Sequence, residues 1–597
     1  MLYPKMTESR VVCSLDGVWK FKLLAAGASY DAGQPLIGPD VVLMPVPCSY
    51  NDIYEGRSFR DHVGGMVYER TVQLSAALFS GRLLLRFGSV THRAKVYVNG
   101  SFAAEHKGGF LPFEIEIGSF VRAGENRITV LADNVVDEST LPCGRLVRRQ
   151  FPGLEESLEN LPNFDFYNYS GIMRPVVLYT TPETYIRDIA VTGETSGVFS
   201  YEISSGGTAE AEVSVEVLAG DGDDTVLFCG TGSSGSGKIE NCRLWSTDDP
   251  YLYRLRVTLT GRGEEELRDV YTEEFGFREF CVRDGGLWLN GAPVYLKGFG
   301  KHEDAAVHGR GFCEAYNVKD IGLMKWMGAN SFRTSHYPYS EEMMRLCDRE
   351  GILVIDEVPA VGLHTGFTAT GLLGGVPHGT WTTLKTAEHH AQVLRELIAR
   401  DKNHPCVIAF SLANEPASEE EGAKEYFEPL FALARETDPQ NRPLTAVTYG
   451  GATPESCKVS ELCDFLMINR YNGWYDTEGN MRGAAALLAD ELERFHGKYP
   501  DKPIVFGEFG ADAVAGMHDV TGDLFSEEYQ EEFIRVYCEL FDTKAYVCGE
   551  HVWNFADFAT AENSKRVQGN KKGVFTRDRR PKKAVWYLRD RWTGQTG

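Results

Sequence analysis

The sequence predicts a multidomain protein in which two antiparallel β-sandwiches precede a (β/α)8 barrel. The chain has 597 residues, more than a single hydrophobic core usually holds. Short strand-like segments separated by Gly, Asn and Asp turns fill roughly the first 277 residues, which is typical of antiparallel sheets. After Phe277 apolar runs alternate with helix-like segments, and this alternation predicts β/α units.

The first two domains are predicted from their strand-like segments. Residues 17–23 (GVWKFKL) and 93–100 (RAKVYVNG) alternate apolar and polar side chains and end at turn residues, as strands of a sandwich do. Residues 184–277 continue in strands and have the length of an immunoglobulin-like sandwich. We therefore expect domains at 1–183, 184–277 and 278–597.

The barrel is predicted from eight apolar runs, each of the length of a buried strand. They lie at residues 294–300, 330–338, 351–359, 406–416, 444–450, 464–472, 503–512 and 549–558. Catalytic groups of such barrels collect at the carboxyl ends of the strands. Polar residues follow the apolar runs at these ends: Arg333, His336, Asp356, Glu357, Asn414, Glu415, Asn469, Tyr471, Glu508 and Trp553.

Glu415 and Glu508 form the candidate catalytic pair, because they end the fourth and seventh predicted strands. Two carboxyl groups across a barrel mouth suit glycoside cleavage, in which one protonates the leaving oxygen and the other attacks the anomeric carbon. His336 and Tyr471 are candidate donors to Glu508. Asp356 and Glu357 are a competing pair, but neighbouring strand residues point to opposite faces, so at most one faces the mouth.

Composition excludes several classes of function. A net charge of -24 argues against a nucleic-acid or anionic-membrane partner. The apolar runs are too short to span a membrane, and the first residues lack a secretory signal. Thirteen scattered cysteines predict free thiols in a reducing compartment, and hence a cytoplasmic protein. Because their spacing does not match that of metal ligands, we expect no metal or cofactor.

His389 and His390 lie in a polar helical stretch and are expected to face solvent.

Positive charge gathers near the end of this acidic chain. Arg566, Lys571 and Lys572 lie within seven residues, next to Asn570. One interpretation is a solvated turn. The other is a cationic site for an anionic part of a substrate, and the surroundings of this turn in space decide between them.

Several segments resemble known signatures. Residues 330–357 and 400–416 resemble the two signatures of glycoside hydrolase family 2, and residues 469–475, 506–512 and 568–582 resemble its β-glucuronidase branch. The resemblance extends over essentially the whole chain. It implies a jelly-roll domain, an immunoglobulin-like domain and a catalytic barrel that cleaves β-D-glucuronides with retention, usually as a homotetramer. It also implies that Glu415 is the acid/base and Glu508 the nucleophile.

The resemblance implies roles for other residues. Asn570 and Lys572 match an Asn-x-Lys element that contacts the C6 carboxylate of the sugar, with Arg566 as a further partner. Asp165 matches an aspartate that reaches the site from the first domain, although a turn residue is an equal alternative. Tyr475 and Trp553 line the sugar pocket or pack within the barrel. Asn472 stands where the family more often has tyrosine, which leaves contacts to the leaving group open.

The Gly-rich segment 361–383 is too long for a simple connector, and segments of this length are usually functional or disordered. The resemblance implies an active-site loop here. Its apolar side chains could cover a hydrophobic aglycone, which predicts a preference for small aryl glucuronides over polysaccharides: Leu363, Phe367, Leu372 and Leu373. Alternative functions are a β-galacturonidase or β-galactosidase of the same family and a non-catalytic carbohydrate-binding protein. The cations near Lys572 argue against neutral galactosides, and the presence of both glutamates argues against a non-catalytic protein.

Overall fold

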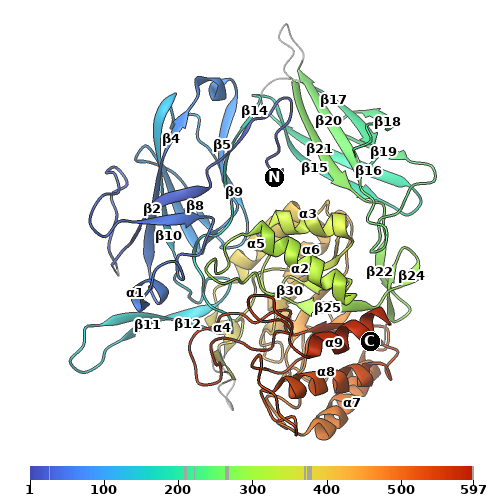
Figure 1. Cartoon of the computed structure of the whole chain (residues 1–597). Coiled ribbons are helices and arrows are strands. Elements are labelled where there is room, and N and C mark those ends of the chain that lie inside the picture. The colour runs from blue at the N-terminus through green and yellow to red at the C-terminus, as the bar shows by residue number, and fades with distance from the viewer. Residues whose placement is uncertain are drawn as a thin grey trace.

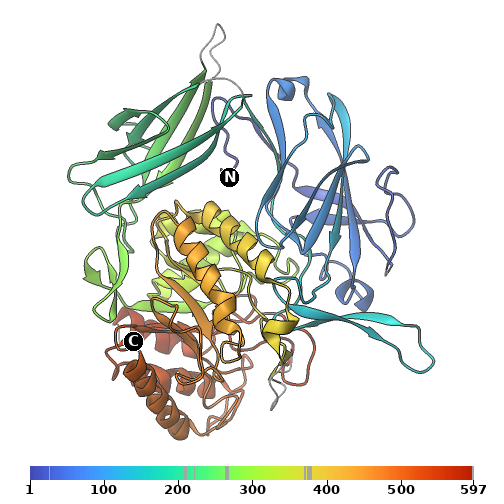
Figure 2. The same cartoon turned by 180° about the vertical axis from the view of Figure 1, so that it is seen from behind.

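The computed structural model confirms two β-sandwiches followed by a closed barrel, and the sandwiches lie side by side over one side of the barrel (Figures 1 and 2). It describes residues 1–25, 27–207, 211–220, 222–261, 268–368, 371–372 and 379–594. Within these residues, no helix combines the length and the apolar character needed to cross a membrane. All thirteen cysteines are free thiols.

The first sandwich packs two antiparallel sheets against each other. Apolar side chains that alternate along the strands, such as Phe21, Tyr68 and Phe87, fill the space between them. One sheet has the order β1 (Val12–Ser14), β14 (Val176–Thr181), β5 (Arg82–Phe87) and β9 (Phe113–Glu116). The other has the order β3 (Val42–Val46), β2 (Gly17–Leu23), β4 (Gly65–Leu74), β10 (Gly124–Asp133), β7 (Arg93–Val98) and β8 (Ser101–Lys107).

Short elements connect the first sandwich to the barrel. A hairpin of β11 (Gly144–Arg149) and β12 (Ser157–Pro162) projects away from the body of the molecule (Figures 1 and 2). The base of this hairpin is tied to the barrel, because Cys143 N–H donates to Val361 O at 3.0 Å. The remaining elements of this domain are β6 (Val90–Thr91), β13 (Gly171–Ile172), α1 (Arg57–Arg60) and the 3-10 helix η1 (Ala76–Phe79).

The second sandwich is smaller and has its own core, with Phe199, Leu255 and Phe277 fully buried. Its three-stranded sheet has the order β15 (Tyr185–Gly193), β16 (Val198–Gly206) and β19 (Ser234–Lys238). Its four-stranded sheet has the order β18 (Val226–Thr231), β17 (Ala211–Leu218), β20 (Tyr253–Gly261) and β21 (Arg268–Phe275). A small sheet of β22 (Phe280–Arg283), β23 (Gly286–Leu289) and β24 (Ala292–Pro293) leads into the barrel.

The barrel is closed by eight parallel strands; seven of the predicted apolar runs contain a strand, and the eighth overlaps β34, which begins two residues earlier. Because its strands are buried on both faces, they appear in the sequence as nearly continuous apolar runs. In order they are β25 (Leu296–Gly300), β26 (Ser331–Arg333), β27 (Leu353–Glu357), β30 (Val407–Asn414), β31 (Leu444–Thr448), β32 (Leu466–Asn469), β33 (Ile504–Glu508) and β34 (Val547–Val552).

Helices cover the outside of the barrel, and their ends follow ordinary capping chemistry. Ser340 and Ser526 accept hydrogen bonds from backbone N–H groups in the first turns of α3 and α8. The helices are α2 (Glu314–Met327), α3 (Glu341–Glu350), α4 (Thr380–Thr383), α5 (Ala387–Asp401), α6 (Ala423–Thr437), α7 (Met481–Lys498), α8 (Glu527–Phe541) and α9 (Ala584–Thr593). Segment 361–383 also holds the hairpin strands β28 (Phe367–Thr368) and β29 (Gly371–Leu372).

The expectation that His389 and His390 face solvent is wrong. Both side chains on α5 are buried, and a ring nitrogen of His390 lies 2.9 Å from Leu412 O of β30. Next to them, Gln392 donates to Lys107 O of the first sandwich at 3.1 Å. Helix α5 is therefore covered on both sides, by the barrel and by another domain.

Candidate active site

Glu415 and Glu508 lie on the wall of one cavity of about 510 Å³ at the carboxyl ends of the barrel strands. Glu508 is the last residue of β33, and Glu415 directly follows β30. Glu415 has a φ of 50°, in the left-handed region that residues other than glycine rarely adopt. The two strands thus deliver both carboxyl groups to one space, as the strand order predicted.

Glu508 is held by two donors. Tyr471 Oη donates to its Oε2 at 2.6 Å, and Arg333 Nη2 donates to its Oε1 at 2.5 Å. A third group, His336 Nε2, lies 3.6 Å from the same Oε1 atom. Charge-assisted hydrogen bonds of this kind stabilise negative charge, which a carboxylate nucleophile requires.

Glu415 has the opposite environment. Burial among the surrounding groups and the negative charge of Glu508 raise the pKa of Glu415 to about 8, and a hydrogen bond from Asn469 Nδ2 at 2.9 Å opposes the rise. At neutral pH Glu415 therefore carries a proton. Two carboxyl groups on one wall with such different surroundings can divide acid and nucleophile work between them.

Arg333 joins the pair to the strand beside it. Its Nη1 donates to Glu357 Oε1 at 2.6 Å, and Ser411 Oγ donates to Glu357 Oε2 at 2.7 Å. Burial raises the pKa of Glu357, but the Arg333 charge together with the contacts of His336 and Ser411 outweighs burial and leaves that pKa below its usual value. Asp356 points the other way, and burial together with Asp401 raises its pKa well above the usual value. Neither residue lines the cavity.

The cationic segment reaches the same cavity. Arg566 lines it and donates to Asp165 Oδ2 from Nε at 2.9 Å and to Tyr475 Oη from Nη2 at 2.7 Å. Asn570 Nδ2 also donates to Asp165 Oδ2, at 3.1 Å. The other oxygen of Asp165, Oδ1, has no hydrogen-bond partner among the described residues. Asp165 thus comes from the first domain, lines the barrel site and keeps a buried oxygen without a hydrogen-bond partner among the described residues.

Lys572 is fully buried rather than solvated. Its Nζ donates to Asp512 Oδ2 and, at 3.1 Å, to Tyr475 Oη. It lies 4.7 Å from the ring centre of Tyr475 and 4.9 Å from that of Trp474. Lys571 takes part mainly through its backbone N–H, which donates to Asp512 Oδ1 at 2.7 Å. The interpretation of this stretch as a solvated turn is therefore wrong for Lys572.

The expected site residues can now be placed. Ten of them line the cavity: Asp165, His336, Asn414, Glu415, Asn469, Tyr471, Tyr475, Glu508, Trp553 and Arg566. Asn570 and Lys572 lie one contact behind the wall, bonded to Asp165 and to Tyr475. The ring of Trp553 stacks on His336 with ring centres 5.0 Å apart.

Models of known protein families match nearly the whole chain. The sugar binding domain of glycosyl hydrolases family 2 matches residues 12–182, a second domain of that family matches 184–278, and its TIM barrel domain matches 280–596. The chain belongs to glycoside hydrolase family 2.

Individual family 2 proteins are similar over their full length. The chain is 42% identical to a β-glucuronidase of Streptococcus agalactiae (99% of this chain, 98% of that protein) and 44% identical to one of Paenibacillus borealis (100% and 99%). Among solved structures, a β-glucuronidase of Faecalibacterium prausnitzii is 43% identical with a TM-score of 0.92, covering 100% of this chain and 99% of that one. One of Ruminococcus gnavus is 40% identical, also with a TM-score of 0.92, covering 99% of each chain.

This family 2 site includes residues that were not expected from the sequence. Phe164, Tyr449 and Val361 line the cavity, together with the expected Phe367. Phe164 directly precedes Asp165 in the sequence, and its position beside an expected site residue could have predicted it. Leu363 is fully buried and is not on the cavity wall, so its expected contact with an aglycone is wrong. The side chain of Leu372 and the whole of Leu373 lie outside the described residues.

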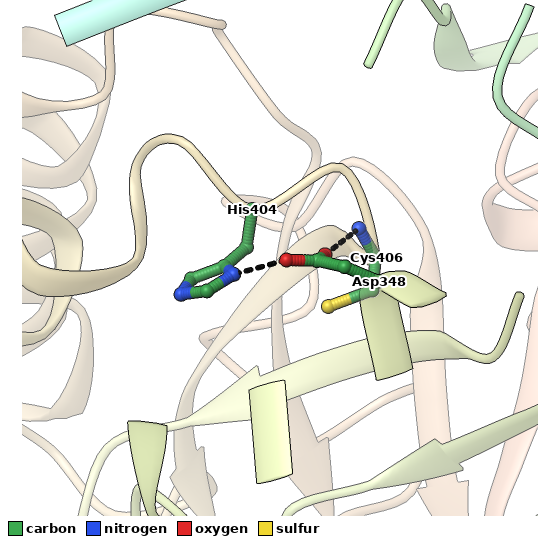
Figure 3. Close-up of side chains that lie close together, drawn as sticks. All are labelled: Asp348, His404 and Cys406. Atoms are coloured by element: carbon green, nitrogen blue, oxygen red, sulfur yellow. Dashed lines mark hydrogen bonds and ion pairs between the residues drawn. The ribbon is translucent and has the colours of Figure 1, made fainter. Parts of the chain in front are cut away.

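A second cluster of ionisable groups lies at the opposite end of the barrel. Asp348 at the end of α3, His404 and Cys406 meet just before β30 begins (Figure 3), and their ligand atoms are close enough to surround a metal ion. The groups bond to one another directly, since His404 Nδ1 contacts Asp348 Oδ2 and Cys406 N–H donates to Asp348 Oδ1 at 3.0 Å. Burial lowers the pKa of His404, but Asp348 outweighs it and raises that pKa. We interpret this cluster as a buried ion pair.

Proposed function

We propose that this family 2 chain is a retaining β-glucuronidase, which hydrolyses β-D-glucuronides to glucuronate and an alcohol or phenol. One observation supports the chemistry above others: Glu415 and Glu508 share a cavity wall, where the pKa of Glu415 is raised and Glu508 accepts hydrogen bonds from Arg333 and Tyr471. The uronate specificity is supported by the cations beside that wall. Relatives named β-glucuronidase cover the whole chain, and the Ruminococcus gnavus enzyme has been solved with D-glucaro 1,5-lactone and with uronic isofagomine.

In the first step, Glu508 attacks the anomeric carbon as the bond to the aglycone oxygen breaks. Glu415 gives its proton to that oxygen, so the aglycone leaves as a neutral alcohol or phenol. The product is a glycosyl ester on Glu508, with Glu415 now ionised. Arg333 and Tyr471 hold the attacking carboxylate in place before the step.

In the second step, Glu415 acts as a base. Esterification removes the charge of Glu508, which is one of the two causes that raise the pKa of Glu415, so that pKa falls in the intermediate. The ionised Glu415 takes a proton from water, the oxygen adds to the anomeric carbon, and Glu508 leaves as a carboxylate. Glucuronate is released with its β configuration kept, and Glu415 is protonated again.

Other residues of the wall bind the sugar in this proposal. Asp165 on the cavity wall accepts a hydroxyl group, and His336, Asn414 and Asn469 lie around the two glutamates. Trp553 and Tyr475 offer ring faces to the pyranose. Lys572 and Arg566 neutralise the C6 carboxylate, as an ammonium and a guanidinium suit an anionic group, and the amide of Asn570 donates to it.

The aglycone lies in the outer cavity, where Phe164, Phe367 and Tyr449 supply aromatic surface. This lining supports a preference for small aryl glucuronides over polysaccharides. The preference is tested by comparing kcat/KM for an aryl glucuronide and for a uronic-acid polymer. Faster cleavage of the polymer would contradict it.

Two experiments test the reaction itself. Nitrophenyl β-glucuronide, β-galacturonide and β-galactoside are compared, and we expect kcat/KM to be highest for the glucuronide; a faster galacturonide or galactoside would replace the proposed specificity. A 2-fluoro glucuronyl donor should trap the ester, and peptide mass analysis should find the label on Glu508. Label on another carboxylate would reject the assignment of the nucleophile.

The proposal includes a cytoplasmic homotetramer. The free state of all thirteen thiols suits a reducing compartment. Light scattering of the purified chain should give four times the mass of one chain. A monomeric mass would reject the tetramer without affecting the proposed chemistry.

A further inference from the structure

Asp512 lies behind the site, and both of its carboxylate oxygens accept hydrogen bonds from the protein. It follows the nucleophile Glu508 by four residues and is 2% exposed. Its Oδ1 accepts from the backbone N–H of Lys571 at 2.7 Å. Its Oδ2 accepts from Arg566 Nη1 at 3.3 Å and from Lys572 Nζ in direct contact. Asp512 does not line the cavity.

A comparison with Asp165 separates two kinds of carboxylate beside the same cations. Asp165 lines the cavity, and its buried Oδ1 has no hydrogen-bond partner among the described residues. Asp512 uses both oxygens within the protein and has no such atom to offer. Asp512 is therefore suited to holding protein groups and not to touching a sugar.

The group that most needs holding is Lys572. Lysine carries its ammonium on a flexible four-carbon stem, and its three N–H donors rotate together. Two partners are present among the described residues, Asp512 and Tyr475. The side chain is fully buried, and a buried ammonium without a counterion is strongly unfavourable. Asp512 supplies that counterion, and the third N–H of the ammonium has no hydrogen-bond partner among the described residues.

We propose that Asp512 is a positioning residue for uronate recognition, which fixes Lys572 and Arg566 so that their remaining donors meet the C6 carboxylate. This inference rests on the proposed glucuronidase function. Fixing the ammonium before binding removes the entropy that a free lysine side chain loses when it binds its ligand. Because Asp512 immediately follows the nucleophile loop, one short segment, Glu508 to Asp512, sets both the attacking group and the carboxylate anchor.

The asparagine variant separates positioning from charge attraction. Asp512→Asn removes one negative charge from the cluster, so attraction alone would strengthen the binding of an anionic ligand. Loss of positioning has the opposite sign, because Lys572 then lacks its strongest contact. A ligand pair that differs at C6 reports this difference directly: uronic isofagomine carries a carboxylate there, and isofagomine carries a hydroxymethyl group.

Calorimetry of the full-length protein gives the two dissociation constants and their ratio. We expect the wild type to prefer uronic isofagomine, Asp512→Asn to lower this preference at least about tenfold, and the affinity for isofagomine to change little. An unchanged or larger preference in the variant overturns the inference, and so does an equal loss for both ligands. If the wild type itself shows no preference, the proposed glucuronidase function fails instead.

Asp557 offers a matched control. It is another buried aspartate, paired with Lys582 Nζ at 2.7 Å in the C-terminal part of the chain, and it does not line the cavity. Asp557→Asn should keep the wild-type ligand preference, and a tenfold loss there overturns the inference. If Asp512→Asn does not fold, Asp512→Glu keeps the charge but displaces the ammonium. It should lose preference by a smaller factor, and full preference in this variant also counts against the inference.

Discussion

The two ends of the barrel both carry buried ionisable groups, yet they differ in what those groups are bonded to. At the amino-terminal end, Asp348, His404 and Cys406 bond to one another (Figure 3). At the carboxyl-terminal end, Glu415 and Glu508 face a cavity of about 510 Å³, and Asp165 keeps an oxygen without a partner among the described residues. Buried charge alone does not identify an active site. An active site is indicated where buried charged groups lie beside a cavity and next to polar atoms that have no hydrogen-bond partner.

Replacing the nucleophile should have the largest effect and tests whether the carboxyl-terminal end performs the chemistry. Glu508→Gln keeps the shape of the side chain but cannot form the glycosyl ester, so kcat should fall by about 10⁴-fold or more on every glucuronide. Thermal unfolding should be monitored as a control. A variant that folds and retains a tenth of the activity would show that the comparison between the two ends misplaces the site.

Replacing the acid should give an effect that depends on the leaving group. Glu415→Ala removes the proton donor, which typically supplies about 10²–10⁴-fold in rate. The loss should be near the upper value for an alkyl glucuronide and far smaller for nitrophenyl glucuronide, because nitrophenol is already acidic. The measurement is kcat/KM for both substrates, because kcat also includes the second step, in which Glu415 acts as the base for every substrate. Equal losses of kcat/KM would assign Glu415 a structural role.

Removing the carboxylate anchor should be specific to the charged sugar. Lys572→Ala should cost about 2–5 kcal/mol of transition-state stabilisation for glucuronides if the ammonium pairs a desolvated carboxylate. Parallel kinetics on a neutral glucoside should change much less. Full glucuronidase activity in this variant would mean that Lys572 only packs within the protein.

The pH profile of the wild type tests the protonation of Glu415. Glu415 must carry a proton in the first step, and its pKa is about 8. Activity measured as kcat/KM should therefore be lost as pH rises through about 8, by about tenfold for each further unit. A profile that declines at pH 5 instead would mean that Glu415 is ionised at neutral pH.

The smallest effect on catalysis is expected at the amino-terminal end. His404→Gln breaks a buried pair and should lower the free energy of unfolding by about 3–5 kcal/mol, with kcat unchanged. The pKa of His404 is raised in the folded state, so the pair stabilises fully below the ordinary pKa of about 6.5 and is lost as pH rises through the raised value. The stability difference from the wild type, from denaturant titrations, should thus shrink at alkaline pH. A large loss of kcat in this variant would mean that the amino-terminal cluster also contributes to catalysis, against the comparison between the two ends.

The sequence predicts the barrel well for a physical reason. Parallel strands with both faces buried are continuous apolar runs, so their carboxyl ends can be read directly, and with them Glu415, Glu508 and Tyr471. Residues on irregular segments carry no such period. Asp512 and Tyr449 were missed for this reason, although both lie only a few residues beyond strand ends.

Contacts between domains were the other limit. His389 looks solvated in sequence because its neighbours are polar, but α5 is covered by the first sandwich. The burial of Lys572 was equally hidden, since Asp512 and Tyr475 come from other loops of the barrel. Local pattern indicates which side chains are polar and not what will cover them.

Asp165 comes from the first sandwich and meets Arg566 of the barrel across the cavity. The catalytic pocket is therefore a joint product of two modules that are far apart in the gene. A recombinant fragment beginning at residue 278 would contain both glutamates but would lack Asp165, which lines the cavity. Exchanging the first sandwich between family members would therefore change residues of the substrate-binding site as well as the rest of that domain.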